Sequence, residues 1–151
     1  MPRFAANLTM LFNEHPFLDR FTAAADAGFE AVEFLFPYDH SPQQVADMLH
    51  GRGLTQALFN LPPGDWAAGE RGIAGLPGRE QEFQDSVGLA LDYAKALNCK
   101  TLHVMSGICP PDADRAHYLE TYAGNLHFAA EMLGKEGITV VVEPPNNRDV
   151  P

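Results

Sequence analysis

Glu143 is the residue of this sequence best placed for acid–base chemistry. It follows the apolar run Ile138-Thr139-Val140-Val141-Val142, which is typical of a buried strand. Side chains alternate along a strand, so Glu143 shares one face with Thr139 and Val141. In α/β barrels the chemistry is built at the carboxyl ends of the strands, which makes Glu143 a candidate catalytic residue. The alternative is a strand-end glutamate that forms an ion pair at the rim.

Three more polar residues lie in or at the end of predicted strands. Asn7 ends the first strand and either hydrogen-bonds a polar substrate or ties down its own loop. Glu33 shares a face with apolar neighbours, so a buried Glu33 needs a partner or a raised pKa. It orients an Arg, a His or a ligand hydroxyl, or else it forms an internal ion pair. His103 lies within a strand, where a histidine is more often a hydrogen-bonded core residue than a ligand.

The most specific stretch is residues 59–72, directly after the third predicted strand. It places the only tryptophan, Trp66, among glycines together with Asp65, Glu70 and Arg71. Arg71 can bind a carboxylate or hydroxyls through two donors, while Trp66 screens the site from water. Equally, the stretch can be a loop pinned by its own tryptophan and by an Arg71–Glu70 or Arg71–Asp65 pair.

Composition excludes several classes of protein. The formal charge of −10 over 151 residues argues against nucleic-acid binding, which needs a basic patch. No apolar run is long enough to cross a bilayer, and the N-terminus lacks the apolar core of a signal peptide. Cys99 and Cys109 lie at opposite ends of one predicted strand, so we expect free thiols in a reducing cytoplasm. The histidines and cysteines lack metal-site spacing.

The elements that position these residues alternate between strands and helices. The predicted strands span 4–8, 31–36, 55–61, 100–105 and 139–143. The predicted helices span 15–27, about 79–97 and 112–135, and a further helix begins at Ser41-Pro42. Ser41 is the expected N-cap before Pro42, and Gly28 and Gly137 end helices. The pattern (βα)₄β predicts one α/β domain with parallel strands. An open doubly wound sheet is the alternative, although no G-x-G-x-x-G or P-loop supports it.

Several motifs together resemble the hydroxypyruvate isomerase family, whose members are xylose-isomerase-like TIM-barrel sugar isomerases and epimerases. The resemblance covers nearly the whole chain in order, and residues 64–72, Gly-Asp-Trp-Ala-Ala-Gly-Glu-Arg-Gly, are its most specific part. The other matching segments are residues 3–12, 32–39, 60–63, 77–80, 102–107 and 143–144.

The resemblance implies an aldose–ketose isomerase of small hydroxy-oxo acids. Hydroxypyruvate and tartronate semialdehyde are the named pair, and a close branch acts on 2-oxo-tetronates. Glu143 would be a metal ligand and an acid/base residue, and a divalent cation, Mg²⁺ or Mn²⁺, would stabilise the enediolate. We expect substrate contacts from Asn7, Glu33, Asn60, Trp66, Glu70, Arg71 and His103. Some relatives carry His in place of Phe59, so a substrate contact there is expected to differ.

The family also has strands six to eight, which carry its second glutamate and the other metal ligands. A TIM barrel takes about 250 residues, so we expect this chain to be the N-terminal (βα)₄β portion of the barrel, truncated after strand five. By itself it should be inactive or nearly so. The open sheet edges favour a homo-oligomer, specifically a dimer. The alternative function is a non-catalytic domain that binds a small hydroxy-acid.

Overall fold

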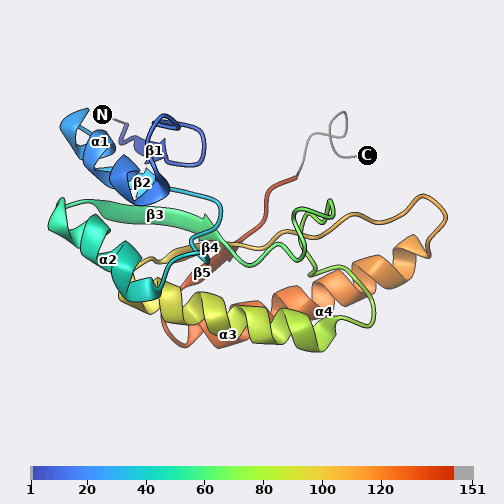
Figure 1. The fold of residues 1–151 in the computed structure, drawn as a ribbon. Coiled ribbons are helices and arrows are strands. Elements are labelled where there is room, and N and C mark those ends of the chain that lie inside the picture. The colour runs from blue at the N-terminus through green and yellow to red at the C-terminus, as the bar shows by residue number, and fades with distance from the viewer. Residues whose placement is uncertain (1, 145–151) are drawn as a thin grey trace. The chain divides into compact units, whose positions relative to one another are not determined.

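Five strands and four α-helices alternate along the chain in the computed structural model, which describes residues 2–144 (Figure 1). Of the stretch Pro144-Pro145-Asn146-Asn147 that follows Glu143, residues 145–147 lie outside the described residues. The strands are β1 Ala5–Asn7, β2 Ala31–Glu33, β3 Thr55–Asn60, β4 Thr101–His103 and β5 Thr139–Val141. The helices are α1 Arg20–Asp26, α2 Pro42–Gly51, α3 Glu80–Ala96 and α4 Arg115–Gly134, with a 3₁₀ turn, η1, at Phe17–Asp19.

The strands form one sheet in the order β1-β2-β3-β4-β5. β1 pairs with β2 in parallel, and β2 pairs with β3 in parallel. Neighbours in sequence are therefore neighbours in the sheet, and the order never reverses. A doubly wound sheet reverses its strand order at a switch point, so the predicted (βα)₄β portion of a barrel is confirmed and the doubly wound alternative is wrong.

All four α-helices end in the same way, so the same kind of turn leads from each helix into the following strand. A residue in the left-handed conformation follows the helix, and the next residue donates its N–H to a carbonyl five positions back. The left-handed residues are Gly28, Gly53, Asn98 and Gly137, with φ of 88°, 67°, 51° and 70°. The bonds are Phe29→Ala24, Leu54→Leu49, Cys99→Ala94 and Ile138→Leu133, at 2.9–3.1 Å. The predicted helix ends at Gly28 and Gly137 are confirmed.

Contacts among the described residues divide them into two compact units, residues 2–59 with 92–101 and residues 60–91 with 102–144. The core of the first unit is aromatic. Phe21, Phe34 and Phe59 are fully buried, and the Phe34 ring centroid lies 6.0 Å from each of the other two. Phe59 also contacts Tyr38 at 6.5 Å between centroids. The Phe59 side chain is therefore part of this core, and the expectation that a substrate contact differs there stays a prediction.

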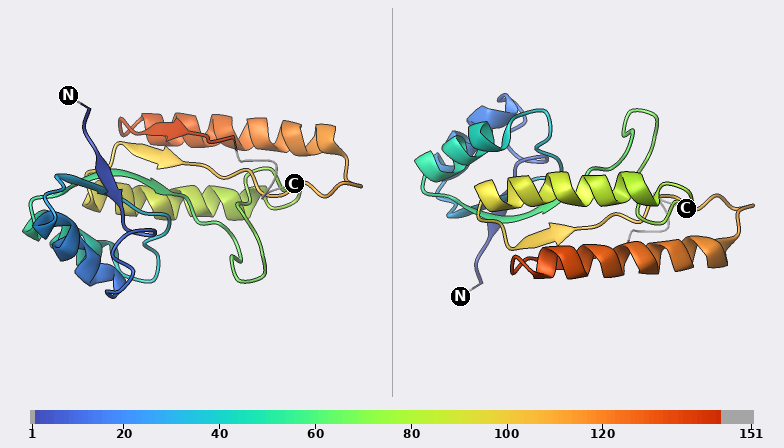
Figure 2. Two further views of the ribbon diagram at one scale, coloured as in Figure 1. Left: turned by 90° about the horizontal axis from the view of Figure 1, so that it is seen from above. Right: turned by 90° about the horizontal axis from the view of Figure 1, so that it is seen from below.

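In the second unit, α4 runs alongside β5 (Figure 2). Leu133 of α4 and Ile138 at the start of β5 are buried. The buried Asn125 donates its side-chain amide to the carbonyl oxygen of Ala74 at 2.8 Å, which ties α4 to the long loop between β3 and α3. This loop is therefore fixed to α4 and does more than connect β3 to α3.

Element boundaries differ from the prediction where polar groups intervene. β2 ends at Glu33 and not at Phe36, because the Leu35 N–H bonds the Thr9 hydroxyl at 2.9 Å. α4 begins at Arg115 because Asp114 caps it, accepting the N–H groups of the second and third helical residues. α1 is shorter than predicted, since residues 17–19 form the 3₁₀ turn. The predicted N-cap at Ser41 is confirmed as a capping box with Gln44. Within the described part of the chain, the helices are too short or too polar to span a bilayer.

Candidate active site

In the first unit, Asn7 and Glu33 lie opposite each other at the ends of β1 and β2. The Asn7 amide donates to Oε1 of Glu33 at 3.1 Å, and its oxygen accepts the N–H of Thr9 at 3.0 Å. Asn7 therefore ties down its own loop and also orients Glu33. The partner of Glu33 is this neutral amide rather than an Arg or a His. The second Glu33 oxygen has no hydrogen bond to the residues that the structure describes.

In the second unit, His103 at the end of β4 is fixed by Asn60 at the end of β3. Nδ1 of His103 lies 3.1 Å from Oδ1 of Asn60, and the Asn60 amide donates toward Sδ of Met105 at 3.6 Å. An amide oxygen only accepts, so the ring carries its proton on Nδ1 and leaves Nε2 as an acceptor when neutral. Asn60 itself is buried.

Glu143 acts on this histidine through its charge. Burial lowers the pKa of His103 below its usual value, and the Glu143 carboxylate partly opposes the shift by raising it. The net lowering keeps the imidazole neutral at pH 7. Glu143 is exposed, two residues beyond the end of β5. The geometry therefore combines an accessible carboxylate, the candidate proton carrier, with a neutral imidazole of fixed tautomer.

Residues 64–72 form a closed loop through a reciprocal pair of bonds. The Asp65 N–H donates to Oε2 of Glu70 at 2.5 Å, and the Glu70 N–H donates to the Asp65 carbonyl at 3.0 Å. Gly64 makes room for this carboxylate: a Cβ at that position would lie 2.0 Å from Oε2 of Glu70. Gly64 also has φ of +80°, which glycine adopts without strain.

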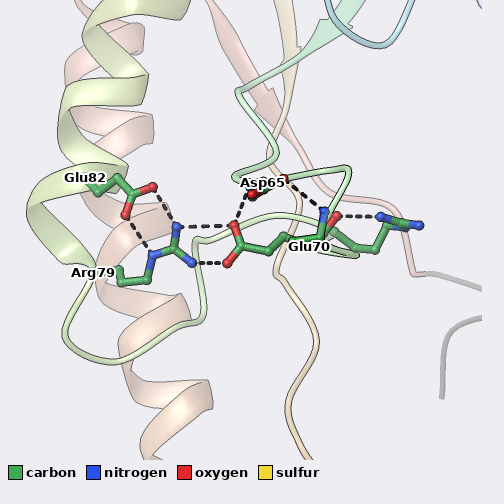
Figure 3. Close-up of polar contacts among 6 residues, drawn as sticks. Asp65, Glu70, Arg79 and Glu82 are labelled. Atoms are coloured by element: carbon green, nitrogen blue, oxygen red, sulfur yellow. Dashed lines mark hydrogen bonds and ion pairs between the residues drawn. The ribbon is translucent and has the colours of Figure 1, made fainter.

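Arg79, just before α3, connects the loop to the helix (Figure 3). Its Nη1 donates to Oε1 of Glu70, and its Nη2 lies 3.2 Å from Oε2 of the same residue. On its other side, Nε and Nη2 each bind Glu82 at 2.7 Å. The Arg79 charge lowers the pKa of both carboxyl groups, first through these hydrogen bonds.

Arg71 lies flat on Trp66, with Cζ 3.9 Å from the ring centroid. Its Nη1 donates to the carbonyl oxygens of Glu70 at 2.7 Å and Trp66 at 3.3 Å. Trp66 is 41% exposed. The ion pair of Glu70 is formed with Arg79 and not with Arg71, so the predicted Arg71–Glu70 pairing is wrong. Arg71 is instead held by carbonyl oxygens and an aromatic face.

The two ends of this loop are joined to each other and to the chain after β4. The Gly72 N–H donates to the Pro63 carbonyl at 2.8 Å, and the Gly107 N–H donates to the Arg71 carbonyl at 3.2 Å. A Cβ on Gly72 would lie 2.3 Å from the Met105 carbonyl oxygen. The glycines predicted to shape this stretch therefore permit close backbone approach.

The family resemblance implies a divalent cation at Glu143. Among residues 2–144, no three His, Cys, Asp or Glu side chains come together in a way that could hold a metal. Glu143 offers one carboxylate, and His103 is bound through Nδ1 to Asn60. The described residues therefore do not fit such an ion by themselves.

The predicted site residues thus fall into three groups: Asn7 with Glu33, Asn60 and His103 with Glu143, and Trp66 with Glu70 and Arg71. Sequence reasoning assigned no role to Arg79, which carries the ion pairs of the third group. Its signal was a basic residue three positions before Glu82 at the start of a predicted helix, a spacing at which side chains meet.

Comparison with known proteins gives one consistent family. The model of the xylose isomerase-like TIM barrel matches residues 21–151. Over its full length the chain is 58% identical to a 2-oxo-tetronate isomerase of Cupriavidus necator and 48% identical to a hydroxypyruvate isomerase of Escherichia coli. A crystal structure from Brucella melitensis, called AP endonuclease, family 2, superposes on the whole chain with a TM-score of 0.97 at 59% identity. The chain spans 58% of the length of each of these three proteins.

Proposed function

The chain belongs to the xylose isomerase-like TIM-barrel family, and we propose that it supplies acid–base and substrate-binding residues to an isomerase of small hydroxy-oxo acids. The isomerase names of its relatives support the reaction class. The observation that carries the proposal is the bond between Nδ1 of His103 and Oδ1 of Asn60 at the ends of β4 and β3, together with the exposed Glu143 carboxylate two residues beyond β5.

In this mechanism Glu143 removes a proton from the hydroxyl-bearing carbon next to the substrate carbonyl. The electron pair of the broken C–H bond forms the C=C bond of an enediolate, and the carbonyl oxygen takes the negative charge. The proton returns to the former carbonyl carbon, and the hydroxyl proton on the other oxygen moves to the former carbonyl oxygen. This leaves a carbonyl at the carbon that lost its proton and gives the isomer. The exchange is internally balanced, so it needs no oxidant or reductant.

His103 has a separate role in the same step. Its Nε2 carries a lone pair, because Nδ1 holds the proton toward Asn60. We assign Nε2 as the acceptor of a substrate hydroxyl hydrogen, which orients the reacting carbons. Its lowered pKa suits this role, because a protonated ring could not accept.

We further propose a four-carbon substrate, a 2-oxo-tetronate, in preference to hydroxypyruvate. The support is the higher identity to the 2-oxo-tetronate isomerase, 58% against 48%, over the same 151 residues. We also propose the cytoplasm as the compartment, since both cysteines are free thiols.

The test is a chimera in which this chain replaces the matching segment of the Cupriavidus necator relative. Interconversion of 2-oxo-tetronate and of hydroxypyruvate is followed by proton NMR. Loss of the acid/base group in Glu143→Gln should lower kcat by a factor of about 10² to 10⁴. Glu120→Gln, an exposed change of the same type on α4, is the matched control and should have no effect.

Each outcome bears on one part of the proposal. Unchanged turnover in Glu143→Gln would remove Glu143 from the mechanism, and a preference for hydroxypyruvate would overturn the substrate. Binding of tartronate with no turnover by the chimera would favour the non-catalytic binding domain. The 151-residue chain is assayed beside the chimera with and without Mg²⁺ or Mn²⁺. We expect little turnover from it, because Glu143 alone supplies one carboxylate of the pair that the family uses.

A further inference from the structure

Three charged residues, Glu70, Arg79 and Glu82, form a network of ion pairs that the proton transfer above does not use. We propose that Arg79 is a positioning residue: its ion pair with Glu70 fixes the 64–72 loop so that Arg71, lying on Trp66, binds the carboxylate group of the substrate. The proposal rests on the proposed function for the identity of the substrate as a carboxylate anion. Its structural part concerns only contacts within the second unit.

Glu70 is not available to bind substrate. Both of its oxygens bind Arg79, and Oε2 also accepts the Asp65 N–H. Without Arg79, the charge of Glu70 would lie beside a site for an anionic substrate and would repel it. Arg79 therefore does two things: it neutralises Glu70, and it holds the carboxylate against the loop backbone.

Arg71 has the donors that a carboxylate requires. Its Nη1 is occupied by the carbonyls of Trp66 and Glu70. The Nε–Nη2 edge has no hydrogen bond to any residue within 2–144, and a guanidinium edge of this kind matches a carboxylate through two parallel bonds. The carbonyls offer only dipoles, so the full positive charge of Arg71 remains for an anion, whereas two carboxylates share that of Arg79.

The two arginines are connected through Glu70. The carbonyl of Glu70 anchors Nη1 of Arg71, and the side chain of Glu70 binds Arg79 nine residues further on (Figure 3). Glu82, in the first turn of α3, holds the opposite edge of Arg79. A shift of Glu70 therefore moves the anchor of Arg71, while Arg79 transmits the rigidity of α3 to the loop.

Trp66 allows a direct test on the 151-residue chain, because it is the only tryptophan. Its fluorescence is measured during titration with tartronate, a small hydroxy-dicarboxylate, and during quenching by acrylamide. Arg79→Gln should weaken tartronate binding by about tenfold or more, the loss expected for one charge-assisted hydrogen bond. It should also increase quenching, while the far-UV circular dichroism of the folded chain stays unchanged. Arg79→Lys should restore part of the affinity.

Two further variants separate positioning from a general loss of charge. Lys135→Gln removes a cation that is paired with Glu131 on α4, outside the loop, and should change affinity by less than about twofold. Glu70→Gln should reproduce only the part of the Arg79→Gln loss that comes from positioning, because it breaks the ion pair without leaving an unpaired negative charge. The double variant should be no worse than Arg79→Gln alone, because both changes remove the same contact.

Several results would overturn the proposal. One is the absence of any change in Trp66 fluorescence when tartronate is added to the unmodified chain. The others are equal affinities of the unmodified chain and Arg79→Gln for tartronate, and additive losses of that affinity in the double variant. Failure of the proposed function would look different: Glu143→Gln would leave turnover of the chimera unchanged while the Trp66 measurements still followed Arg79.

Discussion

Alanine at Gly64 should loosen the 64–72 loop more than alanine at Gly69, although both glycines have left-handed backbones. Their φ values are +80° and +97°. A Cβ at Gly64 would lie 2.0 Å from Oε2 of Glu70 and 2.8 Å from Cγ2 of Ile73, whereas a Cβ at Gly69 would meet nothing within 4 Å. Gly69→Ala therefore measures backbone strain alone, and Gly64→Ala adds displacement of the Glu70 carboxylate.

The size of the difference follows from the contacts that Glu70 would lose. Backbone strain costs about 1–2 kcal/mol for alanine at either position. A hydrogen bond to a charged group contributes about 1.5–3 kcal/mol when buried. The Glu70 side chain is 27% exposed, and solvent screens it. We therefore expect Gly64→Ala to lower the free energy of unfolding by about 1–2 kcal/mol more than Gly69→Ala.

Urea denaturation followed by far-UV circular dichroism measures this difference, and acrylamide quenching of Trp66 locates it in the loop. Only Gly64→Ala should increase quenching strongly. Equal losses of stability in the two variants would refute the reasoning. So would full additivity of Gly64→Ala with Glu70→Ala, because removal of the carboxylate should relieve most of the clash.

Four other predictions concern the rest of the chain. Glu143→Gln should lower the pKa of His103 further, because the Glu143 carboxylate raises it in the unmodified chain. An NMR titration of the ring that shows a higher pKa in the variant would contradict this. Since burial lowers that pKa in the folded state, stability should fall as the pH drops below about 6.5, where the unfolded chain takes up the proton first. Alkylation at pH 8 should modify the half-exposed Cys109 well before Cys99, whose burial raises its thiol pKa, and equal rates would argue against the buried site. The chain should behave as a dimer in light scattering, because β1 is an edge strand preceded by Phe4, which is 73% exposed; a monomer well above micromolar concentration would contradict the expectation.

The order and type of the elements could be predicted because their signals are local. Helix ends at Gly28 and Gly137 and the cap at Ser41 each depend on a few neighbouring residues, and the structure has all three. Strand ends were harder to predict, because contacts distant in sequence decide them. The Leu35 N–H bonds Thr9, which lies in the loop after another strand, and no pattern within residues 31–36 indicates that bond.

The same distinction between local signals and contacts distant in sequence explains which contacts of the candidate site were not predicted. Glu33 was expected to orient an Arg, a His or a ligand hydroxyl, or to form an internal ion pair. Within residues 2–144 its partner is Asn7, which the parallel register places directly opposite. Alignment of the two predicted strands by their polar ends could have found this pair. The ion pair of Glu70 with Arg79 could not be found in this way, because it depends on loop residues with positive φ such as Gly64.

The net charge of the chain, taken alone, gives a misleading indication of the charge of its substrate. A chain with a formal charge of −10 repels anions at long range, which argues against a carboxylate ligand. At physiological ionic strength, however, the Debye length is about 8 Å, so acidic groups elsewhere on the surface are largely screened. Within that distance the local balance matters, and in the 64–72 loop the Glu70 carboxylate is paired with Arg79. The positive charge of Arg71 then dominates at its own Nε–Nη2 edge, and an acidic protein can bind an acidic substrate there.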